Sequence, residues 1–242
     1  MDPEADMPLP PGRKRRRSAP PGRPLTVDVI VDAALGVLVA EGLDAISMRK
    51  VAKELDTGPA SLYAHVSDKD ELLELLLDRI AGRVHLPEPD PDRWQEQLKE
   101  LAREIRKVWN EHRDVARAFM GRFPVGPNQL RVADTLLGLL RAGGMPREIA
   151  VSAVDVLGRY VNAETLDTAG SAFRVEPGKD PEQAVRERTE QFADYFRALP
   201  RQRYPYIVDM VDELVGRDGD QRFELGLDLL VRSFASYAEK EA

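Results

Sequence analysis

The sequence has no cysteine, and this absence removes several classes of protein from consideration. Without thiols the chain has no disulfide framework, no thiolate metal site and no thiol nucleophile. Apolar runs long enough to cross a bilayer are also missing, and the N-terminus has no apolar core like that of a secretory signal. We therefore expect a protein of the cytoplasm that has no membrane partner.

Histidine is scarce, and recognisable catalytic motifs are missing. The three histidines, His65, His85 and His112, lie far apart, and the chain has no HExxH, GxSxG or P-loop motif. The tripeptide His112-Arg113-Asp114 occurs in protein kinases, but the glycine-rich loop and the DFG motif that give it meaning are absent. These absences predict that the protein is not an enzyme and holds neither a metal ion nor a cofactor.

Charge is abundant, and it is distributed unevenly. The 242 residues include 35 bases and 42 acids, a net charge of −7, and 43% are hydrophobic, which is enough for a core. An acidic total argues against nonspecific coating of nucleic acid or of an anionic membrane. Residues 10–25, however, hold six bases and no acid, which indicates one local electrostatic contact.

The first 24 residues contain seven prolines and almost nothing suited to burial, so we predict a disordered basic arm over residues 1–24. Its core, Pro21-Gly22-Arg23-Pro24, is similar to an AT-hook, in which an extended chain lays arginine into a narrow minor groove. Arg23 is therefore a candidate DNA contact. The alternative is a solvated tail that contacts nothing.

Beyond the arm, apolar residues recur at helical spacing, and no stretch alternates as a β-strand does. Thr26 and Ser47 are placed to cap the first two helices, and Gly42 suits the end of the first. A short third helix starts at Pro59 and ends near Val66. The predicted helices are 26–41, 48–55, 59–66, a fourth capped by Ser67 or Asp68 and reaching about residue 86, 92–110, 112–120, 127–142, 147–167, 181–199, 204–215 and 219–238.

The most informative pattern is a pair of short helices joined by the turn Asp56-Thr57-Gly58. Two helices joined so tightly can cross at a steep angle, which presents the second to the DNA major groove, the groove wide enough for a helix. If Leu62 and Val66 face inward, the exposed side carries Pro59, Ala60, Ser61, Tyr63, Ala64 and His65. The predicted fold is all-α, with a three-helix helix-turn-helix domain over 25–72 and a helical bundle over 73–242.

This segment resembles the tetracycline-repressor (TetR) family of transcriptional regulators. The family pattern of a small-residue turn, S/T-L-Y-x-H-[FV] and K-x-x-L-L is matched by Ser61 to Val66 and by Lys69 to Leu73. The similarity extends over about residues 26–73. It implies a helix-turn-helix that reads double-stranded DNA, whereas the alternative is an ordinary helical hairpin with a solvated face.

The chemistry of the matching side chains suggests their roles. The guanidinium of Arg49 can donate two N–H groups to guanine, and Lys69 can place its charge beside phosphate at a helix N-terminus. The helix over 59–66, which would enter the major groove, has no Arg, Asn or Gln. We therefore expect sequence specificity to rest on Arg49, the basic arm over residues 1–24 and DNA shape. The predicted DNA contacts are Arg23, Arg49, Lys50, Pro59, Ala60, Ser61, Tyr63, Ala64, His65 and Lys69.

Two C-terminal segments, 112–124 and 223–230, resemble the regulatory domain of the tetracycline repressors. This resemblance implies a ligand site whose residues are His85, Leu101, Ile105, Phe119, Phe123, Thr135 and Asp167. Helical spacing alone adds Trp109 and Tyr160 as aromatic walls. The alternative is that these aromatic residues are core.

The departures from the repressor pattern predict a different ligand. Phe119 stands where the repressors have a magnesium-binding histidine, and Phe123 stands where they have an arginine. Leu101 and Ile105 replace a polar asparagine and a phenylalanine. We therefore expect no metal–tetracycline chelate, but a larger and more apolar effector with one or two polar anchors.

The last predicted helix has an apolar stripe that includes Phe223, Leu227, Leu230 and Phe234, and it predicts either a dimer interface or internal core. The interpretation that follows is a homodimeric, ligand-responsive regulator, most simply a repressor, that binds a palindromic operator. Two alternatives are a helical protein that sequesters a small molecule and an architectural DNA-binding protein that uses the basic arm.

Overall fold

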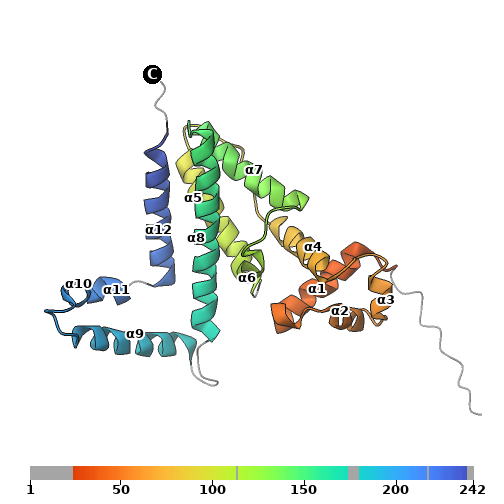
Figure 1. The fold of residues 1–242 in the computed structure, drawn as a ribbon, viewed down its shortest axis with the longest axis horizontal. Coiled ribbons are helices and arrows are strands. Elements are labelled where there is room, and N and C mark those ends of the chain that lie inside the picture. The colour runs from red at the N-terminus through yellow and green to blue at the C-terminus, as the bar shows by residue number, and fades with distance from the viewer. Residues whose placement is uncertain (1–23, 113, 174–179, 217, 239–242) are drawn as a thin grey trace, which may run out of the picture.

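The structure, a computed structural model, describes residues 24–112, 114–173, 180–216 and 218–238, with side chains except at 167–173, 181 and 182. Every regular element in these ranges is helical, which confirms the all-α prediction (Figure 1). In chain order the elements are α1 (Val27–Glu41), the 3₁₀ turn η1 (Leu43–Ala45), α2 (Met48–Glu54), α3 (Pro59–Leu62), α4 (Lys69–Ala81), α5 (Trp94–Asn110), α6 (Val115–Phe119), α7 (Pro127–Ala142), α8 (Arg147–Phe173), α9 (Pro181–Arg197), α10 (Pro205–Asp209), α11 (Val211–Val215) and α12 (Gly219–Ala235).

Local signals set several helix ends as predicted. Thr26 Oγ1 accepts a hydrogen bond from the Val29 N–H at 3.3 Å, and Ser47 Oγ accepts one from the Lys50 N–H at 3.2 Å. Gly42 ends α1 with φ at +88°, a backbone angle that favours glycine. These ends are confirmed because each depends on residues within one helical turn.

Other predicted boundaries differ from the structure. The third helix was expected to reach Val66, but α3 stops at Leu62, and α4 stops at Ala81 rather than near residue 86. The predicted helix over 204–215 is divided into α10 and α11 at Met210, whereas α8 continues beyond residue 167 to Phe173. Helix ends that no capping residue marks are poorly defined by sequence, because the last turns of a helix often loosen.

In the N-terminal part α1 packs on α2 and on α4, and α3 packs on α2, and their buried side chains belong to the hydrophobic core. Helices as short as α2 and α3 are unstable in isolation, so they depend on this packing. Each buried Leu, Ile or Val side chain contributes about 1.5–3 kcal/mol relative to exposure. The buried side chains include Ile30, Ala34, Leu38, Ile46, Val51, Leu62, Val66, Leu72 and Leu76.

The helix α4 belongs to both parts of the molecule. It packs on α1 on one side and on α5, α6 and α7 on the other. Arg79 of α4 pairs with Asp28 and Asp32 of α1. The expected boundary between residues 72 and 73 thus falls inside one continuous helix, and no linker separates the two parts; the division into domains stays a prediction.

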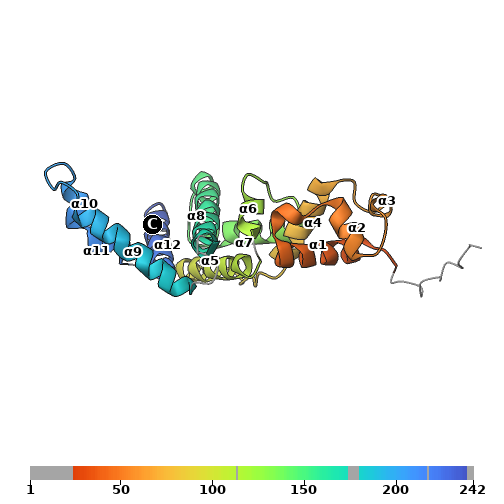
Figure 2. The same ribbon diagram turned by 90° about the horizontal axis from the view of Figure 1, so that it is seen from below.

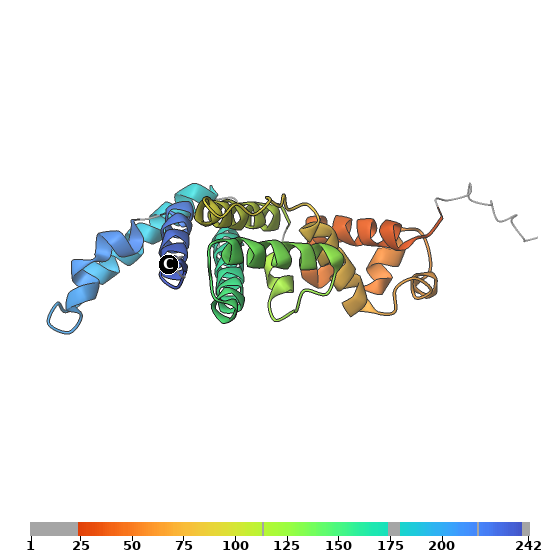
Figure 3. The ribbon, with the colours of Figure 1, turned by 90° about the horizontal axis from the view of Figure 1, so that it is seen from above.

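The larger part is built from α5, α7, α8 and α12, with α6 packed against α8. Viewed from below and from above, the molecule is elongated, with α2 and α3 near one end and α9 to α11 at the other (Figures 2 and 3). Side chains buried in the larger part include Leu98, Leu101, Leu139, Leu140, Leu157, Phe223 and Leu227.

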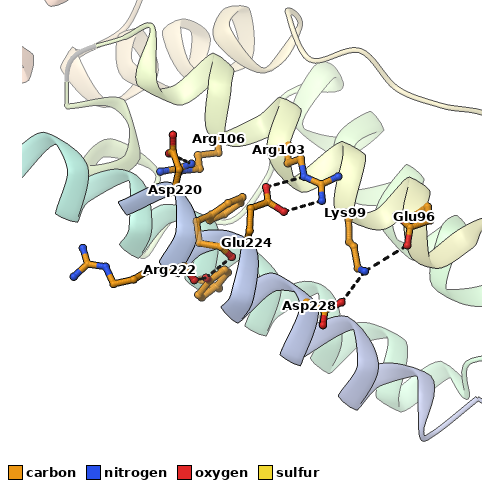
Figure 4. A network of polar contacts seen from close by, with 10 residues as sticks. Glu96, Lys99, Arg103, Arg106, Asp220, Arg222, Glu224 and Asp228 are labelled. Atoms are coloured by element: carbon orange, nitrogen blue, oxygen red, sulfur yellow. Dashed lines mark hydrogen bonds and ion pairs between the residues drawn. The ribbon is translucent and has the colours of Figure 1, made fainter. Parts of the chain in front are cut away.

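The seam between α5 and α12 combines an apolar interior with ion pairs along its edge (Figure 4). Arg103 holds Glu224 through two hydrogen bonds of 2.8 Å, Lys99 Nζ lies 2.9 Å from Asp228, and Arg106 lies 2.8 Å from Asp220. Figure 4 shows these pairs in a row along the two helices. Lys99, Arg103 and Arg106 therefore fix the register of α12 on α5.

The apolar stripe of α12 lies inside the protomer. Phe223 and Leu227 are fully buried, and the ring of Tyr160 stacks on Phe223 with centroids 5.6 Å apart. At Gly226 a Cβ atom would lie 2.2 Å from the Tyr160 hydroxyl, so only glycine fits there. Of the two readings of this stripe, internal core is therefore the one observed, and the apolar residues left exposed on α12 are others, including Leu225 and Leu229.

Acid should weaken the α5–α12 seam. The hydrogen bonds from Arg103 lower the pKa of Glu224 below its ordinary 4.5, and Lys99 likewise lowers the pKa of Asp228. Carboxylates with a lowered folded-state pKa stabilise the fold above their ordinary pKa, and this contribution is lost as the pH falls through the lowered value. We expect the free energy of unfolding, measured by urea denaturation, to fall from pH 5 towards about pH 3.

The variant Glu224→Gln isolates this contribution. At pH 7 the loss of the bidentate ion pair between Arg103 and Glu224 should lower the free energy of unfolding by about 0.5–1 kcal/mol. The effect is modest because the pair is partly exposed. As the pH falls through the lowered pKa of Glu224, towards about pH 3, the variant and the wild type should converge. Equal losses of stability by both proteins on acidification would contradict a role for Glu224.

The helices α9, α10 and α11 pack on one another and form an arm that projects from the lower ends of α8 and α12 (Figure 1). Large apolar side chains are exposed along it: Val185, Phe192, Tyr195, Tyr206, Met210 and Leu214. Within the described ranges no helix is both long and apolar enough to cross a membrane. The arm is thus an amphipathic element with uncovered apolar surface.

Candidate nucleic-acid interface and cavity

The turn between α2 and α3 has the geometry of a helix-turn-helix. The Thr57 N–H donates to the Ala52 carbonyl at 2.9 Å, and Asp56 takes the left-handed conformation, with φ at +49°. Gly58 has an ordinary extended φ of −85°, and nothing lies within 4 Å of the place where its Cβ would be. The fold of one protomer therefore does not demand glycine at position 58, and open space lies beside it.

The short α3 turns its polar side outward. Leu62 and Val66 are buried at 0% and 1% exposure, as the sequence predicts, and they anchor α3 to the core. Tyr63 is 54% exposed. The other exposed members of the predicted contact set on and beside α3 are Pro59, Ala60, Ser61, Ala64 and His65. All six of these side chains are therefore exposed on or beside α3, which lies near one end of the molecule (Figure 1).

Arg49 and Lys50 differ although they are adjacent. Arg49 is exposed, and within the described chain it has no ion pair or hydrogen bond through its side chain. The ammonium of Lys50 is bound by Glu41 at 2.5 Å and lies 3.8 Å from Glu54, and the bond to Glu41 raises its pKa. Arg49 is thus available to an external partner, whereas Lys50 is already engaged.

The N-terminus of α4 is partly occupied by its own side chains. Asp68 is the cap, and its carboxylate accepts from the Glu71 N–H at 2.9 Å. The Glu71 carboxylate accepts from the Ser67 N–H and hydroxyl, which lowers the pKa of Glu71. Lys69 is exposed beside them, so its ammonium, more than free N–H groups, is available here to an external acceptor. Arg23 lies outside the described residues.

A cavity of about 190 Å³ lies in the larger part, between α4, α5, α6, α7 and α8. Its lining is mostly apolar. The lining residues are Ala81, Ile105, Trp109, Phe119, Arg122, Pro124, Gln129, Val132, Ala133, Leu136, Val154, Leu157, Gly158, Val161 and Asn162. Such a composition, apolar with a few polar groups, is typical of small-molecule sites.

An aromatic pair forms one wall of this cavity. The rings of Trp109 and Phe119 are stacked, with centroids 4.5 Å apart and planes 4° from parallel. The Trp109 indole N–H donates to Asn162 Oδ1 at 2.9 Å, which leaves the amide nitrogen of Asn162 as a donor. Flat rings and a small number of polar groups suit a planar, largely apolar ligand.

The sequence-predicted ligand residues are brought together only in part. Ile105, Trp109 and Phe119 line the cavity, and Leu101 is core at 2% exposure outside the lining. His85 is exposed, and Phe123 is 87% exposed, because the loop after α6 turns its ring outward. The side chain of Asp167 lies outside the described residues.

Two further predicted residues have other partners. The Thr135 hydroxyl donates to the Arg131 carbonyl within α7, at 2.9 Å. Tyr160 packs in the α5–α12 seam, where its hydroxyl donates to the Phe223 carbonyl at 2.8 Å, and burial raises its pKa to about 12. Neither residue lines the cavity as the structure describes it.

The prediction missed the polar lining residues Arg122, Gln129 and Asn162. Arg122 directly precedes the predicted Phe123, and a loop has no periodicity that would tell which of two neighbours points inward. Asn162 lies four residues after Gly158 and eight after Val154, which also line the cavity, so helical spacing was the available signal.

Contacts connect the cavity walls to α4. The Asp78 carboxylate accepts from the backbone N–H of Asn128 and of Gln129, at 2.8 and 3.0 Å, and so caps α7. A Cβ on Gly126 would lie 2.2 Å from Asp78, so this approach requires glycine. Because Gln129 and Ala81 line the cavity, its shape and the position of α4 depend on each other.

Family models match two parts of the chain. Residues 30–76 match the model described as "Bacterial regulatory proteins, tetR family", and residues 86–234 match "Tetracyclin repressor-like, C-terminal domain". Between them the two models include α2, α3 and nearly all residues that line the cavity. The resemblance read from the helix-turn-helix and from the C-terminal segments is thereby confirmed at the level of the family.

Individual relatives agree with these models. The HTH-type transcriptional repressor DrrR1 of Streptomyces coeruleorubidus is 32% identical over 232 residues, which cover 90% of this chain and 82% of that protein. The class A tetracycline repressor from transposon 1721 of Escherichia coli is 32% identical over 215 residues, with coverage of 87% and 91%.

A solved structure of ActR from Streptomyces coelicolor in complex with actinorhodin has a TM-score of 0.82 and 42% identity, with coverage of 90% of this chain and 99% of that one. The two chains therefore share the fold along nearly their whole length. An exposed helix-turn-helix, an apolar cavity and these relatives lead to one conclusion: the chain belongs to the TetR family of ligand-responsive, DNA-binding transcriptional repressors.

Proposed function

We propose that two copies of this chain bind a palindromic operator together and are released from it by a small, largely apolar effector. The observation that carries this proposal is α4, which packs on α1 in the helix-turn-helix part and contributes Ala81 to the cavity. The action proposed is binding, and no catalytic step is part of it.

In this proposal α3 enters the major groove, with Arg49 reading guanine at the start of α2. The small residues Ala60 and Ala64 let the helix approach the bases, while Tyr63 and Lys69 donate to phosphate. These residues are exposed, and the described part of the chain offers their side chains no hydrogen bond or ion pair, which supports this assignment. Lys50 has a secondary role, because releasing it from Glu41 costs an ion pair.

A dimer is required because a palindrome presents two half-sites about 34–36 Å apart, or a multiple of that spacing. The exposed apolar residues of α8 and α12 support a twofold interface there: Val151, Val156, Leu225, Leu229 and, just beyond α12, Tyr237. The arm of α9 to α11 adds further uncovered apolar surface. Four such helices, two from each copy, can form an antiparallel bundle.

The cavity supports an aromatic, largely apolar effector. At about 190 Å³ it is smaller than a typical drug-sized site of about 300–1,000 Å³, so we infer that its walls move apart when a ligand enters. The related ActR was solved with actinorhodin, which makes actinorhodin itself the first candidate to test. To weaken operator binding a hundredfold, the effector must prefer the non-binding dimer by about 2.7 kcal/mol.

The proposal is tested with DNA from upstream of the protein's own coding sequence. A palindromic fragment should be bound by the purified protein in a fluorescence anisotropy titration, and actinorhodin should displace the protein from it. A fragment whose anisotropy does not rise on addition of the protein would favour the alternative of a protein that sequesters a small molecule. Equal binding to any AT-rich duplex, unchanged by Arg49→Ala, would favour the architectural one.

The variant Leu136→Trp distinguishes effector action inside the cavity from action elsewhere. Leu136 is 6% exposed and lines the cavity, so the larger indole should fill it, at a cost of about 1–3 kcal/mol in stability. We expect operator affinity within about threefold of the wild type and no release by actinorhodin. Full release from this variant would show that the effector acts at another site.

A further inference from the structure

The side chain of Arg122 both lines the cavity and contacts α4. It follows α6 in the loop that leads to α7, three residues after the ring of Phe119. Its guanidinium Nη2 lies 3.2 Å from Asp70 Oδ1, and Nη1 lies 3.9 Å from Glu74 Oε1. One side chain therefore joins the ligand cavity to the helix that supports the DNA-binding end.

Arg122 is the charged member of an otherwise neutral lining. Among the described residues around the cavity no other carries a formal charge, and the remaining polar ones are the amides Gln129 and Asn162. An apolar cavity with a single cation favours a ligand with a single anionic group, because the low dielectric of the walls strengthens that pairing.

The present partners of Arg122 hold it weakly. The side chains of Asp70 and Glu74 are 77% and 47% exposed, and ion pairs of this kind contribute little to stability because water and salt screen them. The left-handed Gly121, with φ at +74°, precedes Arg122 and gives the loop a backbone that other residues rarely adopt. A ligand anion inside the cavity can therefore compete for the guanidinium.

We propose that Arg122 selects an aromatic effector with an acidic substituent, a carboxylate or an ionised phenol, and exchanges its two α4 carboxylates for that group. The inference rests on the proposed function, since it names the chemistry of the same effector. Exchange leaves Asp70 and Glu74 without their cation, in the first two turns of α4 and near Lys69. Two uncompensated negative charges close to a phosphate contact oppose DNA binding, so ligand capture and operator release are coupled through one side chain.

The test compares 2-naphthoate with the neutral 2-naphthamide, two probes of the same ring system, by isothermal titration calorimetry. The wild type should bind the acid about tenfold or more tightly than the amide. Arg122→Met should remove this preference and leave the affinity for the amide within about twofold. Arg117→Met is the matched control, because Arg117 pairs with Asp44 outside the cavity lining, and it should retain the preference.

A second variant tests the exchange itself. In Asp70→Asn/Glu74→Gln the guanidinium has no competing carboxylates, so the acid should bind about threefold or more tightly than to the wild type, with the amide unchanged. The acid should also release this variant from the operator less completely than it releases the wild type.

Equal affinity for acid and amide in the wild type, a preference that survives Arg122→Met, or no binding of either probe would each overturn the inference. If one of these outcomes is found and the wild type still binds its operator, the inference fails but the proposed function stands. Absence of operator binding, by contrast, refutes the proposed function and not the acid preference, which calorimetry measures without DNA.

Discussion

Replacing Arg49 by alanine is expected to lower operator affinity about 10- to 100-fold, equivalent to about 1–3 kcal/mol for a lost two-bonded base contact. Arg49 is exposed at the start of α2, and the described chain offers its guanidinium no internal partner. Because the contact is to a base, discrimination between operator variants at one position should also weaken. Fluorescence anisotropy with the palindrome and with single-base variants measures both effects.

Lys69→Ala serves as the contrasting variant for a phosphate contact. It should weaken binding to all sequences alike and reduce the slope of log affinity against log salt by about 0.9. Lys50→Ala should have a smaller effect than Arg49→Ala, because Lys50 is bound by Glu41. If Arg49→Ala left affinity and base discrimination unchanged, the proposed orientation of α2 and α3 on DNA would be wrong.

Phe223→Ala is expected to have the largest effect on stability, a loss of about 3–5 kcal/mol in the free energy of unfolding. Phe223 is 1% exposed and stacks against Tyr160. The guanidinium carbon of Arg106 lies over the Phe223 ring, 4.4 Å from the ring centroid. Its removal leaves a cavity at the seam where α12 crosses α5 and α8, and surrounding helices collapse into such a space only partly. Urea denaturation at equal protomer concentration measures the difference.

Phe123→Ala is the matched control, since the same side chain is deleted at a position that is 87% exposed. Its effect on stability should stay within about 0.5 kcal/mol. Similar losses for the two variants would contradict the burial of the α12 stripe inside the protomer. Because α12, the helix that carries Phe223, lies far from α3, the folded fraction of Phe223→Ala should bind operator with wild-type affinity (Figure 1).

The helix-turn-helix could be read from the sequence because its signals are local. Thr26 and Ser47 cap helices through bonds to residues three positions away, and Leu62 and Val66 were predicted inward from helical spacing alone. Caps and turns of this kind depend only on residues that are close in the sequence, so the sequence is enough to predict them. The outward residues of α3 followed once the buried side was known.

The cavity was predicted less well because it depends on five helices that meet in space. Ile105, Trp109 and Phe119 were identified, but Tyr160 points into the α5–α12 seam and Phe123 points to solvent. A rotation of a helix about its axis by a fraction of a turn decides which neighbour an aromatic ring contacts, and spacing along the chain does not give that angle. The α12 stripe had the same ambiguity, because core and dimer interface require the same periodicity.

By itself the sequence determined the all-α class, the capped helix ends and the outward side of α3, since each follows from interactions within a turn or two of chain. Only the tertiary structure decided which residues surround the cavity, that Phe223 is internal, and that Arg122 reaches α4. The physical reason is that these contacts join residues far apart in the chain, whose meeting depends on how whole helices pack rather than on any local pattern.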